Sequence, residues 1–338
     1  MSRVPPIPSV PPAPRGARER WRRRLVTVPA YVLAFLITVA LFPALLLLAL
    51  AVDVLRRSRT WSTARLTLFL LCFLAVENLG FLLLLRTWLT TRAGSRLRQE
   101  RAFAVQRLYV GALLACFARL FSLRFQIDGN DRVAPGPLLV FVRHASLIDV
   151  LVPGVFIANA HRIELRYVLK KELLIEPCLD IAGHWIPNHF VDRSGQDSEQ
   201  ELDAIRRLKA DLGRHEGVIL YPEGTRFSHG KRRALIAKLQ GEDRADAESL
   251  QHLLPVRRGG ALALLDAAPA CDVLFVGHHG LEGFTRLADI WGGALVGKTV
   301  RIRFWREPAA SVPATEPERL AWLRERWLRM DAWLKEIE

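Results

Sequence analysis

A histidine and an aspartate follow a short apolar segment near the middle of the chain. His144 and Asp149 come after LLVFV at 138–142. If a strand ends there, both side chains lie where α/β folds hold reactive groups. A helix beginning near Ser146 would bring Asp149 to the imidazole, where it would fix the ring tautomer and stabilise the imidazolium. His144 would then act as a general base toward an alcohol. A His-x4-Asp pattern often arises by chance, so a capping or buried histidine is the alternative for this motif taken alone.

A second polar segment, PEGTRFSHGKRR, follows the apolar segment GVILY at 217–221. Arg226 offers a planar guanidinium suited to a phosphate. Glu223 would orient that arginine or a substrate hydroxyl. We predict a substrate-binding loop made of Glu223, Gly224, Thr225 and Arg226. Three basic residues just downstream either hold the diphosphate of a thioester carrier or form a solvated face: Lys231, Arg232 and Arg233.

Together these motifs resemble the glycerolipid acyltransferase family, the lysophosphatidic acid acyltransferases and their relatives. In that family a His-x4-Asp motif precedes a Glu-Gly-Thr-Arg block with the spacing found here between His144 and Glu223. A middle block at 168–195 and a fourth block at 252–260 agree in the same order. Their matching positions are Lys171, Glu172, Leu173, Pro177, Gly183, Phe190, Asp192, Arg193, Pro255 and Gly259 or Gly260. The resemblance covers roughly 120–285. The extended EGTRF segment is also similar to the branch with lysocardiolipin and lysophosphatidylinositol acyltransferases.

The resemblance implies a direct acyl transfer that needs no metal, no cofactor and no covalent intermediate. His144, oriented by Asp149, would deprotonate the acceptor hydroxyl, which would attack the thioester of acyl-CoA or acyl-carrier protein. Backbone donors near the EGTR loop would stabilise the oxyanion. Arg226 would hold the acceptor phosphate, with Lys171 and Arg193 as further candidates. The first-choice acceptor is 1-acylglycerol 3-phosphate, which gives phosphatidic acid. The alternative is another lysophospholipid, such as lysophosphatidylinositol or lysocardiolipin.

The sequence departs from the family's pattern beside the histidine. Many members have Asn at that position, whereas this chain has Arg143. This arginine would either alter head-group preference or replace a structural hydrogen bond. Residues 229–250 form a charged insert to which the sequence assigns no role.

Short apolar segments alternate with helical patterns from about residue 122 onward. This alternation predicts an α/β fold with a central mixed sheet flanked by helices. The acyltransferase domain is expected over 102–338. Strands are expected at 123–127, 138–142, 165–169, 217–221, 272–277 and 300–304, and helices at 147–160, 197–213, 257–267 and 316–336.

Two apolar runs near the N-terminus predict a two-helix membrane anchor. Residues 25–52 carry no charge, and residues 66–85 carry one, Glu77. Both runs suffice for a span, which needs about 20 apolar residues. We expect a membrane hairpin over 25–90, preceded by a disordered basic tail at 1–24. Because a carboxylate within the bilayer is costly, Glu77 should lie near an interface or bond to the first helix.

The net charge of +14 is concentrated beside these runs. Residues 1–120 hold 18 Arg, no Lys and four acidic residues, and the remainder of the chain is balanced. A nucleic-acid-binding domain would carry its own basic patch, so no nucleic-acid partner is expected. The arginines outside the hairpin predict that both its ends, and the catalytic domain, lie in the cytoplasm. Four arginines between the two runs leave a re-entrant or interfacial hairpin as the alternative. The Arg-rich composition suggests a bacterial inner membrane. Residues 102–121 are expected to form an interfacial helix or the first helix of the globular domain.

Three other classes of protein compete with this interpretation. A serine hydrolase would use Ser146 beside His144, but the sequence has no G-x-S-x-G elbow. A metal site would draw on the other histidines, which show no H-E-x-x-H pattern, and the four cysteines are isolated. The third alternative, a membrane-bound lipid-binding protein without catalysis, would not need the complete motifs.

Overall fold

The computed structural model describes residues 14–191, 199–266, 271–284 and 287–338. The chain divides into two compact units. The first comprises Met1–Phe121 with Leu169–Asp192, and the second comprises Ser122–Val168 with Arg193–Glu338. Residues 102–121, predicted as part of the catalytic domain or as an interfacial helix, therefore group with the N-terminal helices.

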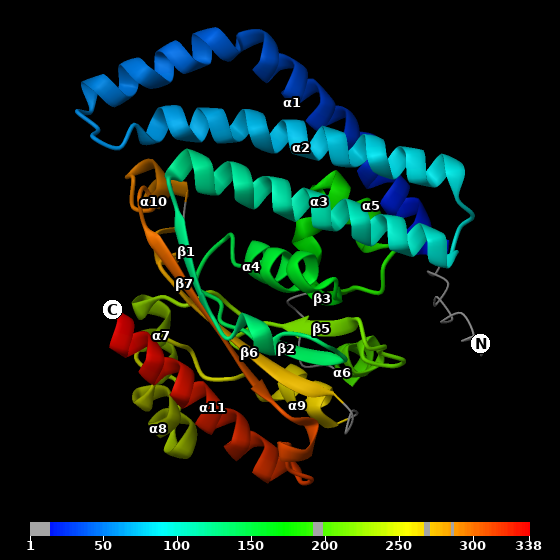
Figure 1. The fold of residues 1–338 in the computed structure, drawn as a ribbon, viewed down its shortest axis with the longest axis vertical. Helices are drawn as coiled ribbons and strands as arrows, with labels where there is room; N and C mark the ends of the chain where they lie inside the picture. Colours follow the sequence, from blue (N-terminus) through cyan, green and yellow to red (C-terminus); the bar gives the residue numbers. More distant parts are fainter. Residues whose placement is uncertain (1–13, 192–198, 267–270, 285–286) are drawn as a thin grey trace. The chain divides into compact units, whose positions relative to one another are not determined.

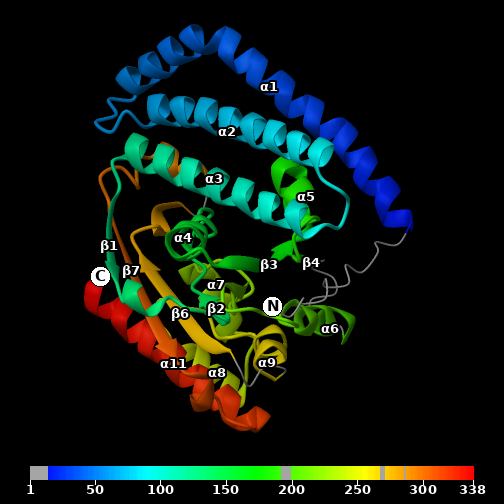
Figure 2. The same cartoon turned by 45° about the vertical axis from the view of Figure 1, so that its right-hand side comes forward.

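The first unit is built on three long helices, α1 (Pro14–Leu55), α2 (Ser62–Thr90) and α3 (Arg96–Phe121), with α2 packed against both others (Figures 1 and 2). All three are long and apolar enough to cross a membrane, where the sequence predicted two. Helix α1 bends in both views, and it contains Pro29 and Pro43. Proline removes a backbone hydrogen bond inside a helix and so explains a bend.

The basic N-terminal tail differs from its prediction. Residues 14–24 are helical rather than disordered, while residues 1–13 lie outside the described part of the chain. Arg23 and Arg24 both bind the buried carboxylate of Asp180, at 2.8 and 3.0 Å. Burial raises the pKa of Asp180, but hydrogen bonds from His184 and the two arginines outweigh it and hold the pKa below its usual range. These ion pairs account for the order of this segment, because they fix the first turns of α1 to a distant part of the chain.

Asp180 lies in α5 (Pro177–Gly183), a short helix of the first unit that follows the 3-10 helix Lys171–Ile175. Glu77 of α2 accepts a 2.8 Å hydrogen bond from the backbone nitrogen of Cys178, in the first turn of α5. Glu77 thus caps a helix N-terminus, where backbone N–H groups lack partners within the helix. Of the two alternatives predicted for Glu77, a bond to the first helix is replaced by this contact with α5, and a position near an interface stays a prediction.

The second unit contains a mixed sheet, as predicted. The strands of this unit lie in the order β1-β7-β6-β2-β5-β3, in which β6 and β7 are antiparallel and the other neighbouring pairs are parallel. All five residues of β2 are buried, which suits a central strand covered on both faces. The short strand β4, which belongs to the first unit, was not predicted. The strands are β1 (Arg124–Asp128), β2 (Leu138–Val142), β3 (Glu164–Lys170), β4 (His189–Val191), β5 (Glu216–Leu220), β6 (Asp272–His279) and β7 (Thr299–Glu307).

Helices cover both faces of this sheet. Helices α6, α9 and α11 pack on one face around a core that includes Phe141, Phe275 and Trp327. Helix α4 and the π-helix that follows it lie on the other side of the sheet (Figure 1). The helices of this unit are α4 (Leu151–Pro153), the π-helix Gly154–Asn159, α6 (Glu199–Leu208), α7 (His229–Ile236), α8 (Gly241–Ser249), α9 (Arg258–Asp266), α10 (Leu287–Trp291) and α11 (Glu316–Ile337). Short 3-10 helices occur at Asn130–Arg132, Glu282–Phe284 and Ala309–Ser311.

Candidate active site

Three neighbouring strands bring the site together. Strand β2 pairs with β5 on one side and β6 on the other. His144 follows β2, Glu223 follows β5, and His278 lies near the end of β6. Because β2 runs parallel to both partners, these three residues share one edge of the sheet, where α/β proteins place their sites.

His144 and Asp149 form a hydrogen-bonded pair. His144 Nδ1 lies 3.0 Å from Asp149 Oδ2, and the aspartate side chain is fully buried whereas the histidine side chain is 18% exposed. The pairing at Nδ1 leaves Nε2 for a substrate proton. The ring of Tyr221 lies beside the imidazole, with centroids 4.8 Å apart. The pair has the chemistry of a general base oriented by a carboxylate.

The loop that carries Asp149 differs from the predicted helix. Helix α4 begins at Leu151 and not at 147. Asp149 Oδ2 instead accepts hydrogen bonds from the backbone nitrogens of Ala145 and Ser146, at 2.6 and 2.8 Å. An Asp side chain that binds nearby backbone N–H groups competes with helix formation, which explains the later start. The same bonds fix the carboxylate that faces His144.

Glu223 joins the two motifs. Its Oε1 accepts a 2.7 Å hydrogen bond from the backbone nitrogen of His144, and its Oε2 accepts one of 2.9 Å from the backbone nitrogen of Leu254. The backbone nitrogen of Phe227 also donates to the carbonyl of His144. Burial raises the pKa of Glu223 to about 8. Because both carboxylate oxygens bind the backbone, the structure gives Glu223 a positioning role in place of the predicted contact with Arg226, and its contact with a substrate hydroxyl stays a prediction.

The other residues of the predicted EGTR loop each have a distinct environment. Gly224 has a φ of +65° and lies against Arg257, whose Cδ would be 2.6 Å from an added Cβ, so glycine is required there. Thr225 accepts a hydrogen bond from Lys231 Nζ at 3.0 Å. Arg226 is half-buried, and its side chain makes no hydrogen bond or ion pair with the residues the structure describes. Its guanidinium is therefore available for an anion.

The comparison with protein families is decisive for the class of this site. Residues 124–267, which hold His144, Asp149 and the EGTR loop, match the family described as Acyltransferase. This region of the chain therefore carries an acyltransferase domain. No curated protein matches the sequence.

The fold of this acyltransferase is similar to that of a solved enzyme. The crystal structure of the 1-acyl-sn-glycerophosphate (LPA) acyltransferase PlsC from Thermotoga maritima matches it with a TM-score of 0.55 and 15% sequence identity. The match covers 80% of this chain and 94% of that one. At this identity the likeness concerns the fold, and it confirms the predicted α/β arrangement with helices preceding it.

An ion pair between the buried Arg143 and the partly buried Glu282 lies beside the site, and the sequence did not predict it. Arg143, 2% exposed, binds Glu282 Oε1 and the backbone carbonyls of His278 and His252. Burial raises the pKa of Glu282, but the Arg143 cation outweighs it and lowers the pKa to about 2. Of the two roles predicted for Arg143, these contacts favour the structural one. The departure from Asn before the histidine was the signal for it.

His278 is a further residue that the sequence analysis did not single out for this site. It is fully buried, and its Nε2 lies 3.1 Å from the Arg143 carbonyl and 3.4 Å from Asp149 Oδ1. Burial lowers its pKa, so the neutral ring is favoured. An Nε2 proton would then be donated to the Arg143 carbonyl, while Asp149 Oδ1 has no hydrogen-bond partner among the described residues. His278 therefore lies against the Asp149 carboxylate without a hydrogen bond to it.

The remaining predicted residues are Lys171, Arg193 and the basic residues after the EGTR loop. Lys171 is exposed at the start of the 3-10 helix Lys171–Ile175 in the first unit, and Arg193 lies outside the described residues. Arg232 does not face a ligand: it binds the backbone carbonyls of Glu248 and Leu250 and so ties α7 to the end of α8. The role of Lys171 and Arg193 in binding substrate stays a prediction.

The competing chemistries find little support in the described residues of the acyltransferase. Ser146 is fully buried, its hydroxyl faces the carbonyl of Phe284 at 3.4 Å, and it accepts from the backbone nitrogen of Ile148. The Ser146 hydroxyl is therefore not exposed to act as a nucleophile. Within the described ranges, no three His, Cys, Asp or Glu side chains are grouped to hold a metal ion.

Proposed function

We propose that this acyltransferase transfers a fatty acyl group from an acyl thioester to the free hydroxyl of 1-acylglycerol 3-phosphate, forming phosphatidic acid. One observation carries the proposal. The backbone of His144 is hydrogen-bonded to both Glu223 and Phe227, so the imidazole base and the intervening Arg226 belong to one connected loop structure. This arrangement suits an acceptor whose reacting hydroxyl is close to a phosphate.

In the proposed reaction His144 Nε2 removes the proton of the acceptor hydroxyl. The oxygen attacks the thioester carbonyl, and a new carbon–oxygen bond forms. Collapse of the tetrahedral intermediate breaks the carbon–sulfur bond, and the imidazolium returns its proton to the leaving thiolate. Asp149 stabilises the imidazolium between these steps. Arg226 binds the acceptor phosphate. The only small-molecule partners needed are the two substrates.

We place the reaction at a bacterial inner membrane with the catalytic unit in the cytoplasm. The three apolar helices of the first unit support membrane association. The arginines at 15–24 and 86–101 support a cytoplasmic location for the chain ends of the α1–α2 hairpin. Lysophospholipid acceptors reside in the bilayer, so an anchored enzyme meets them there.

The test is an acceptor panel. Membranes containing the protein receive labelled acyl-CoA with lysophosphatidic acid, lysophosphatidylinositol, lysocardiolipin or no acceptor. We expect labelled phosphatidic acid to dominate. Arg226→Ala should raise the KM for lysophosphatidic acid about tenfold or more, because a charge-assisted phosphate contact is lost. The matched control is Arg244→Ala, which removes an exposed arginine of α8.

Each other outcome of the panel has a definite meaning. Product from another lysophospholipid alone would keep the reaction and change the acceptor. Release of free fatty acid without any acylated acceptor would indicate a thioesterase. Absence of product with both acyl-CoA and acyl-carrier protein would contradict the proposed function.

A further inference from the structure

A pocket of about 730 Å3 lies in the second unit between α7, α8, α11 and the segment 254–258. Glu223, Gly224 and Thr225 form part of its wall, so it adjoins the EGTR loop. His144 is not among the described residues that line it. The pocket is therefore next to the reacting histidine but separate from it. Its volume is within the range usual for small-molecule sites, about 300–1,000 Å3.

The charged insert at 229–250 builds one side of this pocket. It folds into α7 and α8, and Asp243 and Asp246 of α8 pair with Arg258 and Arg324. These ion pairs tie α8 to α9 and α11, and they neutralise the two carboxylates at the pocket wall. The insert thus has a defined position, and the carboxylates of Asp243 and Asp246 are paired with arginines of the protein.

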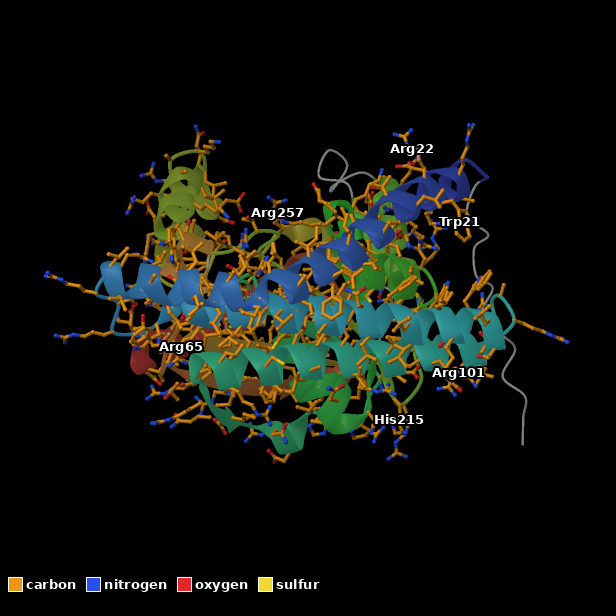
Figure 3. The ribbon with its side chains drawn as sticks, turned by 90° about the horizontal axis from the view of Figure 1, so that it is seen from above. Trp21, Arg22, Arg65, Arg101, His215 and Arg257 are labelled. Atoms are coloured by element: carbon orange, nitrogen blue, oxygen red, sulfur yellow. The ribbon has the colours of Figure 1, made fainter. Side chains whose placement is uncertain are left out.

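The lining of the pocket combines apolar side chains with a rim of exposed cationic ones. Lys231, Lys238 and Arg257 are exposed residues of the lining (Figure 3 labels Arg257). Arg257 lies over Gly224, and Lys231 Nζ bonds to Thr225 and to the Arg226 carbonyl. The apolar lining includes Leu235, Leu239, Val256 and Leu328. A ligand with an anionic group and a flat or apolar body matches this combination.

We propose that this pocket binds the nucleotide end of the acyl donor, the adenosine 3′-phosphate 5′-diphosphate of coenzyme A. This inference rests on the proposed acyl transfer. In coenzyme A the phosphates and adenine lie at the opposite end of the pantetheine arm from the thioester. A donor bound this way would leave its phosphates in the pocket and extend its thioester toward His144. The cations of the rim bind the phosphates, and the apolar lining residues cover the adenine.

The acceptor fits this pocket less well. In 1-acylglycerol 3-phosphate the phosphate is attached to the carbon next to the one bearing the reacting hydroxyl. Its cationic partner must therefore lie close to His144, where Arg226 is carried by the adjoining loop. The pocket rim, which lies apart from His144, suits a phosphate that is distant from the reacting atoms.

The test uses the full-length protein in detergent micelles and adenosine 3′,5′-bisphosphate as the probe. Lys238→Glu reverses the charge of an exposed rim residue, so it should not disturb folding. Lys335→Glu makes the same change on an exposed lysine of α11 outside the pocket lining, and it is the matched control. Binding of the probe is measured by calorimetry, and the KM values for acyl-CoA and lysophosphatidic acid are measured separately.

We expect Lys238→Glu to weaken probe binding and raise the KM for acyl-CoA by roughly fivefold to tenfold, with kcat and the KM for lysophosphatidic acid unchanged. Lys335→Glu should match the wild type. A rise confined to the KM for lysophosphatidic acid, or a probe affinity equal in all three proteins, would overturn the assignment. Because the probe is not a substrate, its binding is measured even if acyl transfer fails, and the two proposals can therefore fail separately.

Discussion

The carboxylate of Glu223 lies 2.7 Å from the backbone nitrogen of His144, although 78 residues separate them in the chain. The other carboxylate oxygen binds the backbone nitrogen of Leu254. A single buried side chain therefore connects the loop after β2, the loop after β5 and the segment that precedes α9. The position of His144 depends on this glutamate, which need not touch a substrate to be required for activity.

Replacement of Glu223 by glutamine tests that positioning role. Glu223→Gln puts an amide N–H group opposite one of two backbone N–H donors, leaving a buried hydrogen bond unmade at a cost of about 1–3 kcal/mol. We expect a lower melting temperature and a lower kcat, measured by thermal unfolding in detergent and by acyl transfer. Glu242→Gln, an exposed glutamate of α8, should behave as the wild type. A raised acceptor KM with unchanged melting temperature would instead favour substrate contact.

The pH dependence of stability gives an independent test of the same residue. Burial raises the pKa of Glu223 from 4.5 to about 8, so the folded state binds its proton more tightly than the unfolded state. The corresponding stability is fully present below about pH 4.5 and is lost as pH rises toward 8. The melting temperature of the wild type should therefore fall more steeply across this window than that of Glu223→Gln. Parallel curves would contradict the raised pKa.

His278 should affect catalysis through Asp149. Removing the imidazole in His278→Ala takes away the group 3.4 Å from Asp149 Oδ1, and we expect kcat to fall about tenfold with both KM values unchanged. His278→Gln can place an amide nitrogen where Nε2 lies and should recover most of the rate. If alanine and glutamine lower kcat and melting temperature equally, the histidine only fills space.

Disrupting the ion pair beside the site distinguishes the two roles predicted for Arg143, the structural one and the choice of head group. Arg143→Asn leaves the partly buried Glu282 carboxylate without its cation, which should destabilise the fold by about 2 kcal/mol. The double variant Arg143→Asn with Glu282→Gln should regain most of that loss in thermal unfolding. A changed preference among lysophospholipid acceptors, with no change in melting temperature, would show that Arg143 contributes to recognition of the head group.

The parts of the fold that depend on local pattern were predictable from the sequence. The uniformly apolar segment 138–142 is the buried central strand β2, and the amphipathic pattern at 316–336 is α11. Helices α7 and α8 were missed because the insert at 229–250 is rich in charge, and their position depends on ion pairs with residues far along the chain. The antiparallel direction of β7 likewise follows from packing and not from its own residues.

The candidate site was predictable to a similar extent. The spacing of His144 and Asp149 identified a pair that the structure holds 3.0 Å apart. The later start of α4 could not be predicted, because it depends on which backbone groups the Asp149 carboxylate binds. Partners such as Arg143 with Glu282, or His278 with Asp149, join residues more than 100 positions apart. Such long-range pairings cannot be predicted from a local sequence pattern.

The most direct test of the central claim is acyl transfer from labelled acyl-CoA to lysophosphatidic acid by the wild type and by His144→Ala, at matched protein levels and melting temperatures. The account predicts labelled phosphatidic acid with the wild type and a rate about a hundredfold to ten-thousandfold lower without the imidazole base. Phosphatidic acid formed at the wild-type rate by His144→Ala would contradict it.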